Sequence, residues 1–329
     1  MLTQTNRILW RRFRQGFLLI VMKKKVFIIG NGFDLDLGWK TSFKDFVGSK
    51  FWPLRSTQSK CPMAMFLEQA VGIDRWFDLE SLLKRFASND VYYGAADPED
   101  EEFFHVLRGA LTDYLKQEEQ KSLRTEATAA RVLKSVLANG YFTSIYSFNY
   151  TDLHGIARLV GVGTPFNYEH VHGSIADNSI IVGIDAHSDV RDGYSYLRKI
   201  NSEHYRSHQI RYDLQECDEV IFFGHSLGDI DYPYFYDFFS SQSHCSSRSD
   251  GKYITIFTKD NRSRFQILDQ LRSMNGGETE HLQNDNYFKL IMTDAPDPVL
   301  MNQFFSHLEK DSVKSNDTVI MNLASEFSL

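Results

Sequence analysis

The chain has 329 residues and a formal net charge of −7, so it can bury a sizeable core but lacks the basic surplus that broad binding of nucleic acid or anionic membrane requires. Its three cysteines (Cys61, Cys217, Cys245) are too scattered for a zinc site and odd in number for a disulfide framework, which indicates a reducing cytoplasm and no zinc. No apolar stretch reaches the roughly 20 residues of a membrane span, although a local basic patch stays open.

The N-terminal segment resembles a signal peptide only superficially. Residues 10–14 are basic and residues 16–22 are apolar, but Lys23, Lys24 and Lys25 stand where small residues would form a cleavage site. We therefore expect Met22 to be the physiological start and residues 1–21 to be an upstream extension. At the other end, residues 311–329 have the pattern of a weakly specified tail.

Short apolar runs rich in β-branched and aromatic residues recur along the chain, and such runs are typical of buried parallel strands. The first, residues 26–29, ends directly at a glycine. The other predicted strands are residues 145–148, 180–184, 220–223, 253–257 and 288–292, with a weaker candidate at 169–172.

Helical patterns lie between several of these strands, at residues 127–137, 152–159, 205–215 and 262–274. Alternation of strand and helix predicts an α/β fold with a doubly wound, Rossmann-like parallel sheet within residues 22–310. Residues from about 61 to 125 break this rhythm, because they are rich in Leu, Phe and acidic residues without a convincing strand. We expect a helical insertion there, and a long loop or lid in the polar segment 185–203.

The first strand runs straight into Gly30-Asn31-Gly32. Glycine permits a tight turn and lets backbone N–H groups approach phosphate oxygens, whose charge is favoured by the following helix N-terminus. Position 35 is leucine, whereas the full G-x-G-x-x-G dinucleotide fingerprint has glycine there. An ordinary strand-to-helix turn therefore stays open as the alternative.

Two further polar motifs follow predicted strands. Asn149 has an amide that can hydrogen-bond a ribose hydroxyl or a water, and Asp152 can either orient it or cap the next helix. His170 and His172 alternate on a strand and would face the same side, but no nearby Cys, His or carboxylate group completes a metal site. His172 precedes a glycine, which suits a base close to a ligand; a structural histidine is the alternative.

The fourth motif, residues 224–231, opens another strand onto a turn bracketed by glycines. Its Gly224-His225-Ser226-Leu227-Gly228 matches the G-x-S-x-G pattern of a hydrolase nucleophile elbow, with Ser226 as the nucleophile. A serine hydrolase would need a downstream histidine, and the candidates His244, His281 and His307 lie outside strand-end settings. We favour a turn that contacts ribose or phosphate, because all four motifs fall where open α/β sheets bind ligands.

In order and combination, these blocks resemble the AbiH phage abortive-infection family. They are Gly30 to Leu35 with Gly38 and Ser42, Trp76-Phe77-Asp78-Leu79-Glu80, Ser147 to Asp152, His170 to Gly173, and Gly224 to Asp231. The resemblance covers roughly residues 26–257. The set is also distantly similar to a sirtuin arrangement around NAD, which implies a sirtuin-like Rossmann fold.

The sirtuin resemblance implies a role for each block. Gly30, Gly32 and Gly38 match the phosphate loop, Asn149 and Asp152 the ribose region, His172 the catalytic histidine and Ser226 a late nucleotide-contacting serine. It thereby implies Asn149, His172 and Asp152 as catalytic residues. The implied nucleotide-binding residues are Gly30, Asn31, Gly32, Phe33, Asp34, Gly38, Gly224, His225, Ser226 and Asp229.

The departures from sirtuins shape the functional hypothesis. Asn31 replaces the usual alanine, Asp34 replaces a small hydroxyl residue, and the zinc-ribbon cysteines of deacetylases are absent. The resemblance thus implies an antiphage effector that binds NAD and hydrolyses its nicotinamide–ribose bond, with Asp78 and Glu80 as further site groups or as cap and solvated acids. The alternative is a sensor that binds a nucleotide without turnover, because a carboxylate at position 34 repels a diphosphate. A phage-derived trigger and a homo-oligomer are compatible with either.

Overall fold

A computed structural model describes residues 10–13, 16–19, 24–55, 61–73, 78–88, 96–138, 142–244 and 251–310. Several predicted features fall outside these residues: the start at Met22 with most of the extension before it, Trp76 with Phe77 of the second block, Cys245, and the tail at 311–329. Strands β1 (Trp10–Phe13) and β2 (Gly16–Leu19) pair with each other in an antiparallel sheet of their own. In the described part of the chain, no helix has the length and apolar character that a membrane crossing needs.

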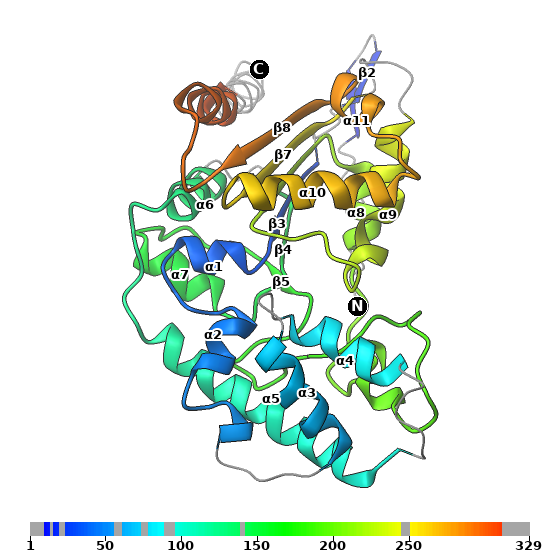
Figure 1. Ribbon diagram of the computed structural model, residues 1–329. Helices are drawn as coiled ribbons and strands as arrows, with labels where there is room; N and C mark the ends of the chain where they lie inside the picture. Colours follow the sequence, from blue (N-terminus) through cyan, green and yellow to red (C-terminus); the bar gives the residue numbers. More distant parts are fainter. Residues whose placement is uncertain are drawn as a thin grey trace.

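A six-stranded sheet, parallel throughout, forms the centre of the molecule, which confirms the predicted fold class (Figure 1). Its spatial order is β5-β4-β3-β6-β7-β8. The strand of this sheet that comes first in the sequence, β3, therefore lies in the middle, and the order reverses between β3 and β6. This is the Rossmann order, whose reversal point is where such sheets bind ligands. The strands are β3 (Lys25–Ile29), β4 (Ser144–Ser147), β5 (Glu169–His170), β6 (Glu219–Phe223), β7 (Tyr253–Thr258) and β8 (Tyr287–Met292).

Both faces of the sheet are covered by helices, because alternate residues of each apolar strand point to opposite sides. Phe27 and Ile29 pack with α1, α6, α7 and the helix at residues 298–310, whereas Val26 and Ile28 pack with α8, α9, α10 and α11. The bounds are α1 (Gly32–Asp36), α6 (Thr128–Ala138), α7 (Leu153–Leu159), α8 (Ile210–Glu216), α9 (Tyr232–Ser243), α10 (Asn261–Met274) and α11 (Glu280–Asn284).

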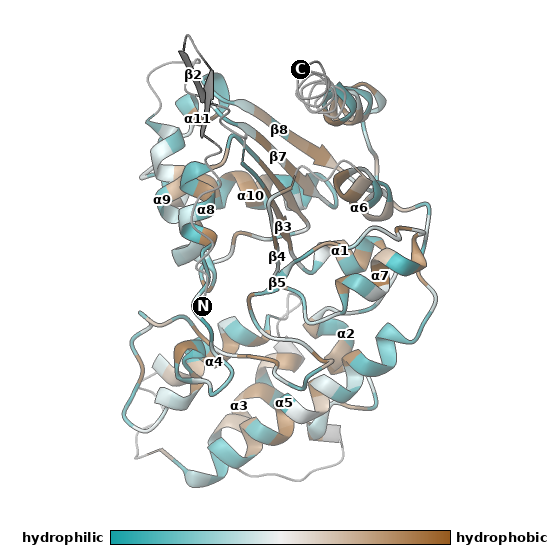
Figure 2. Cartoon of the chain, turned by 180° about the vertical axis from the view of Figure 1, so that it is seen from behind, coloured by the Kyte–Doolittle hydropathy of each residue, from teal (hydrophilic) through white to brown (hydrophobic). Residues whose placement is uncertain are grey.

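A second helical layer lies beyond the carboxyl end of the sheet (Figures 1 and 2). Most of its helices lie in the stretch 61–125, in which we expected a helical insertion. Two short helices at residues 43–48 and 53–55 precede that stretch, and all of them share a core of their own. The longest begins as its sequence dictates, since Asp97 caps its first turn and Pro98 takes the first helical position. The layer contains α2 (Phe43–Gly48), η1 (Pro53–Arg55), α3 (Pro62–Ile73), α4 (Leu79–Ser88) and α5 (Pro98–Glu119).

Two predicted elements differ in the structure. The apolar run 180–184 is no strand of the sheet: Ile180, Val182 and Ile184 are buried against the helical layer, and Ile184 alone forms an isolated bridge with Arg198. The helix predicted over 205–215 begins only at Ile210, and His208 before it is paired with Glu169 of β5. The polar segment after 184 is a loop, as expected, with the short turns η2 (Ser195–Leu197) and η3 (Lys199–Asn201).

Candidate functional site

The turns that follow β3 and β6 interlock at the reversal point of the sheet. Gly30 N–H donates to Phe223 O at 2.9 Å, and Gly32 N–H donates to Gly224 O at 2.8 Å. A Cβ on Gly32 would lie 2.6 Å from Gly224 Cα, and Gly224 has a φ of +64°. These glycines are therefore required by the packing of one backbone against another, and the Gly32 N–H already has a protein partner.

The other residues expected at the first turn divide between core and surface. Phe33 is buried edge-on against Phe223, with ring centroids 5.3 Å apart, so its side chain belongs to the core. Asn31 is exposed and accepts a hydrogen bond from Thr41 Oγ1 at 2.6 Å. Gly38 follows α1 at a φ of +99°, where Arg124 packs beside it.

Asp34 is the polar centre of the β3–β4 side of the site. It is 1% exposed and accepts hydrogen bonds from Asn149 Nδ2 at 2.8 Å and Thr151 Oγ1 at 2.9 Å. Burial raises the pKa of Asp34 to about 7, and these two hydrogen bonds offset the rise only in part. The structure therefore brings together Asp34 and Asn149, two residues of the predicted site.

Asn149 keeps one polar atom without a partner. The residue is 5% exposed, and within the described structure its Oδ1 is buried and has no hydrogen bond. Leaving a buried carbonyl oxygen unpaired costs about 1–3 kcal/mol, so such an atom in a native protein calls for an explanation. A hydroxyl group of a bound ligand, or a water bound together with that ligand, would supply the missing donor.

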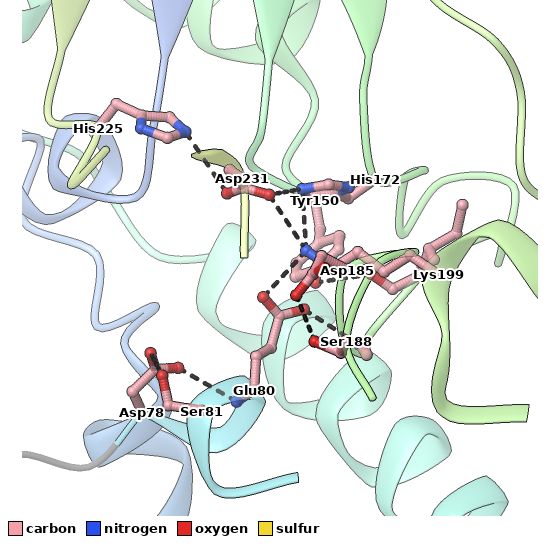
Figure 3. A network of polar contacts seen from close by, with 12 residues as sticks. Asp78, Glu80, Ser81, Tyr150, His172, Asp185, Ser188, Lys199, His225 and Asp231 are labelled. Carbon is pink, nitrogen blue, oxygen red and sulfur yellow. Dashed lines mark hydrogen bonds and ion pairs between the residues drawn. The ribbon is translucent and has the colours of Figure 1, made fainter. Parts of the chain in front are cut away.

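His172 is the centre of the other half of the site, next to β5. Its Nε2 lies 2.8 Å from Asp231 Oδ1 and 3.1 Å from Lys199 Nζ (Figure 3). The shorter contact is to a carboxylate, which only accepts, so Nε2 carries the proton and Nδ1 is the unprotonated nitrogen of the neutral ring. Burial and the Lys199 charge lower the pKa of His172, which keeps the ring neutral at physiological pH.

Lys199 of η3 contacts this histidine, and Glu80 of α4 contacts Lys199. The Lys199 ammonium lies 3.0 Å from Glu80 Oε2 and 3.3 Å from Asp231 Oδ1, while Glu80 Oε1 accepts from the Gly183 N–H at 3.1 Å. Burial would raise the pKa of Asp231, but Lys199 and His172 outweigh it and hold that pKa well below its ordinary value. Glu80 and Asp231 share the ammonium of Lys199. Burial raises the pKa of Glu80 to about 7, although the charge of Lys199 lowers it.

His225 flanks the same carboxylate from the β6 turn. The Leu227 N–H donates to His225 Nδ1 at 3.0 Å, so the neutral ring carries its proton on Nε2, which lies 3.6 Å from Asp231 Oδ2. Burial lowers the pKa of His225 to about 4. Phe148 packs edge-on against both histidine rings, at 5.2 Å from His172 and 4.4 Å from His225.

Other predicted site residues have local structural roles or lie apart. Asp152 caps α7 by accepting from the His154 N–H at 2.9 Å, and Asp78 accepts from the Glu80 N–H at 3.1 Å at the start of α4. Asp229 is exposed and bonded to Gln270. The sequence named Asp229 of the fourth block as a nucleotide contact, whereas the aspartate that the structure places beside His172 is Asp231.

Ser226 is exposed on the β6 turn, and no hydrogen bond joins it to a histidine among the residues that the structure describes. The downstream histidines have other partners: His244 bonds Ser240 O, His281 pairs with Asp285, and His307 pairs with Glu219. The geometry gives no support to a nucleophile elbow.

The sequence blocks and this geometry agree with a comparison against protein-family models. Residues 26–249 match the family described as "Bacteriophage abortive infection AbiH". The chain belongs to the AbiH family. Its family therefore gives it a role in abortive infection, a defence against phage. No curated protein matches the AbiH chain.

Proposed function

We propose that this AbiH protein binds NAD at the carboxyl end of its Rossmann-like sheet and hydrolyses the nicotinamide–ribose bond during phage infection. The observation that carries the proposal is the unpaired, buried Asn149 Oδ1 next to the sheet's reversal point. Ligands of open α/β sheets bind at that point, and a ribose hydroxyl or the attacking water has the donor that Oδ1 lacks.

His172 supplies the base. In the hydrolysis, water adds to the ribose C1′, the C1′–N bond breaks with its electron pair going to nicotinamide, and one water proton leaves. The neutral His172 has Nδ1 unprotonated, because its Nε2 proton is held by Asp231 at 2.8 Å. A positioned base of this kind contributes roughly 10²–10⁴-fold to a rate.

A second candidate is a sensor that binds a nucleotide without turnover, and the charge of Asp34 bears on both candidates. The Asp34 carboxyl lies two residues beyond Gly32, where a diphosphate would come close, and its partners Asn149 and Thr151 are both uncharged. Above a pH of about 7, where Asp34 is ionised, that charge opposes a diphosphate at the turn. Binding without catalysis would leave the same pocket residues in use.

The decisive experiment measures NAD binding by calorimetry and nicotinamide release by chromatography, on purified protein with and without infected-cell extract. We expect His172→Ala to retain NAD binding and lose roughly 10²–10⁴-fold in turnover. His187→Ala, which removes an exposed histidine of the 185–203 loop, is the matched control and should behave as wild type. Binding without nicotinamide release would establish the sensor instead, and absence of binding would exclude both.

A further inference from the structure

The ammonium of Lys199 lies where the helical layer meets the sheet. Lys199 is 7% exposed, and its Nζ lies within 3.3 Å of side chains from three different segments: Glu80 on α4, His172 after β5 and Asp231 before α9. Figure 3 shows these side chains converging on Nζ. No motif of the sequence marks this lysine, which stands in the loop 185–203 that packs against the helical layer.

The distances show how the charges are balanced around His172. Asp231 Oδ1 receives two donors, His172 Nε2 at 2.8 Å and Lys199 Nζ at 3.3 Å. With the ammonium in place, the carboxylate charge is balanced and His172 needs to donate only one proton from a neutral ring. Without it, the buried carboxylate would draw a second proton onto the ring, because a nearby opposite charge favours the imidazolium.

We propose that Lys199 is a positioning residue, which balances the charge of Asp231 and so keeps the His172 proton on Nε2 with Nδ1 free to act as the base. The proposal rests on the proposed role of His172 in NAD hydrolysis. It also explains why Glu80 is buried at this place: the carboxylate of α4 fixes the ammonium against the sheet, with its other oxygen anchored by the Gly183 N–H.

Several charged and titratable groups surround His172. Asp231 favours the charged ring, while Lys199 and the more distant His208 disfavour it. Glu80 acts through Lys199, Tyr234 contacts the ring at 6.4 Å between centroids, and His225 shares Asp231. Lys199 is the one of these that lies within hydrogen-bond distance of His172 Nε2 and carries a permanent positive charge.

The test is nuclear magnetic resonance of the full chain labelled with ¹⁵N-histidine, in which long-range proton–nitrogen spectra distinguish the protonated from the free ring nitrogen. The His172 signal is assigned by its loss in His172→Gln. In the wild type we expect a neutral ring with its proton on Nε2 at physiological pH. In Lys199→Met the ring should take up a second proton, with its pKa raised by roughly 1–3 units.

Two variants control for general effects of charge and folding. Lys84→Met removes a different ammonium, which lies on α4 and pairs with Asp185 at 3.1 Å. It should leave the titration of His172 unchanged. Glu80→Gln keeps the Lys199 ammonium and removes a competing carboxylate, so the pKa of His172 should stay or fall. If Lys199→Met does not fold, the double variant Lys199→Met/Glu80→Gln buries one carboxylate fewer, and the same rise is expected in it.

The inference is overturned if His172 keeps its wild-type titration without Lys199, if Lys84→Met shifts it equally, or if Glu80→Gln raises its pKa. In the NAD assay, the acid limb of the pH profile of kcat/KM should move to higher pH in Lys199→Met, by the same amount as the pKa of His172. A wild type that does not release nicotinamide would remove the proposed function while the spectra still decide the role of Lys199. A wild type that turns NAD over, with no spectral change in Lys199→Met, would remove the inference alone.

Discussion

Two buried aspartates of the site differ in what balances their charge. Asp231 has an ammonium and an imidazole beside it, and its pKa is held well below its ordinary value. Asp34 has only neutral donors, and its pKa is raised by burial to about 7. Neutral hydrogen bonds thus compensate for lost solvation less well than a buried cation does. Asp231 is ionised throughout the physiological range, whereas Asp34 changes its charge within it.

The unpaired oxygen of Asn149 can be tested against a matched neighbour. Asn149→Ala and Thr151→Val each remove one hydrogen bond to Asp34, but only the first removes Oδ1. We expect Asn149→Ala to weaken NAD binding about tenfold or more, since a ligand hydrogen bond contributes about 0.5–1.5 kcal/mol and more in a buried site. Thr151→Val should cost clearly less. Equal losses in calorimetric titrations would show that Asn149 acts only by holding Asp34.

Asp34 also predicts a pH dependence of stability. Its pKa in the folded protein, about 7, lies above the ordinary value of 3.8, so between these values the folded state holds a proton that the unfolded chain has released. Stability from this group is therefore present at low pH and lost as the pH rises toward 7. Relative to wild type, Asp34→Asn should gain up to roughly 3 kcal/mol in free energy of unfolding from about pH 5 to 8.

Urea denaturation at both pH values measures this difference for Asp34→Asn. Asp229→Asn, which changes an exposed aspartate bonded to Gln270, is the control and should follow the wild type at each pH. A difference between Asp34→Asn and wild type that stays constant with pH would contradict a raised pKa at this carboxyl.

Sequence patterns located part of this site and missed the rest for a physical reason. Asn149 and His172 were found because polar residues at strand ends share one edge of a parallel sheet. Lys199 was missed because a lysine in a polar loop has no pattern of its own, and its burial results from contacts with Glu80 and Asp231, which lie far from it in the sequence. Asp231 stood inside a recognised block, but spacing alone does not tell which of two aspartates turns inward.

At the level of elements, the turns after β3 and β6 determine how closely the two strands' ends approach. Their glycines stand backbone against backbone, so they serve the fold whether or not a phosphate binds there. A bulky substitution at Gly32 would disturb this packing directly. Loss of nucleotide binding in such a variant would therefore say little about the ligand, and substitutions at Asn149 and His172 are the better probes.

The packing of these turns predicts a large cost for Gly224→Ala. The new Cβ would lie 2.4 Å from Gly32 C, and the φ of +64° disfavours any residue with a side chain. We expect a loss of roughly 2 kcal/mol or more in free energy of unfolding by urea titration. Gly109→Ala, inside α5 and with open space around it, is the control and should gain up to about 1 kcal/mol. A Gly224→Ala protein as stable as wild type would refute the packing argument.

The strands themselves were predictable where the apolar run was short and ended at a turn. Residues 26–29, 220–223 and 253–257 correspond to β3, β6 and β7 within one residue at each end. The run 180–184 has the same composition, yet Ile180 and Val182 pack on the helical layer. An apolar run indicates that a segment is buried, but it does not indicate which part of the molecule the segment packs against.

At the scale of the whole molecule, the helical layer and the sheet meet through charged side chains at the site. Asp185 binds Lys84, Arg191 donates to Phe86 O at 3.0 Å, and Lys199 carries the contact on to the sheet. The loop 185–203 is thereby held against α4, and it presents the Lys199 ammonium to His172. Any displacement of this layer from the sheet would separate Lys199 or Glu80 from the residues that follow β5 and β6.

The proposed function makes a prediction for infected cells. Under the proposed NAD hydrolysis, cells that express the wild type should lose NAD after infection and release fewer phages, whereas cells with His172→Ala should keep both NAD and phage yield. Protein levels must be matched by immunoblot, and His187→Ala should protect as the wild type does, since its histidine is exposed and makes no contact with Asp231 or Lys199. Protection that persists in His172→Ala while NAD stays constant would show that the chain defends the cell by a route other than hydrolysis at this histidine.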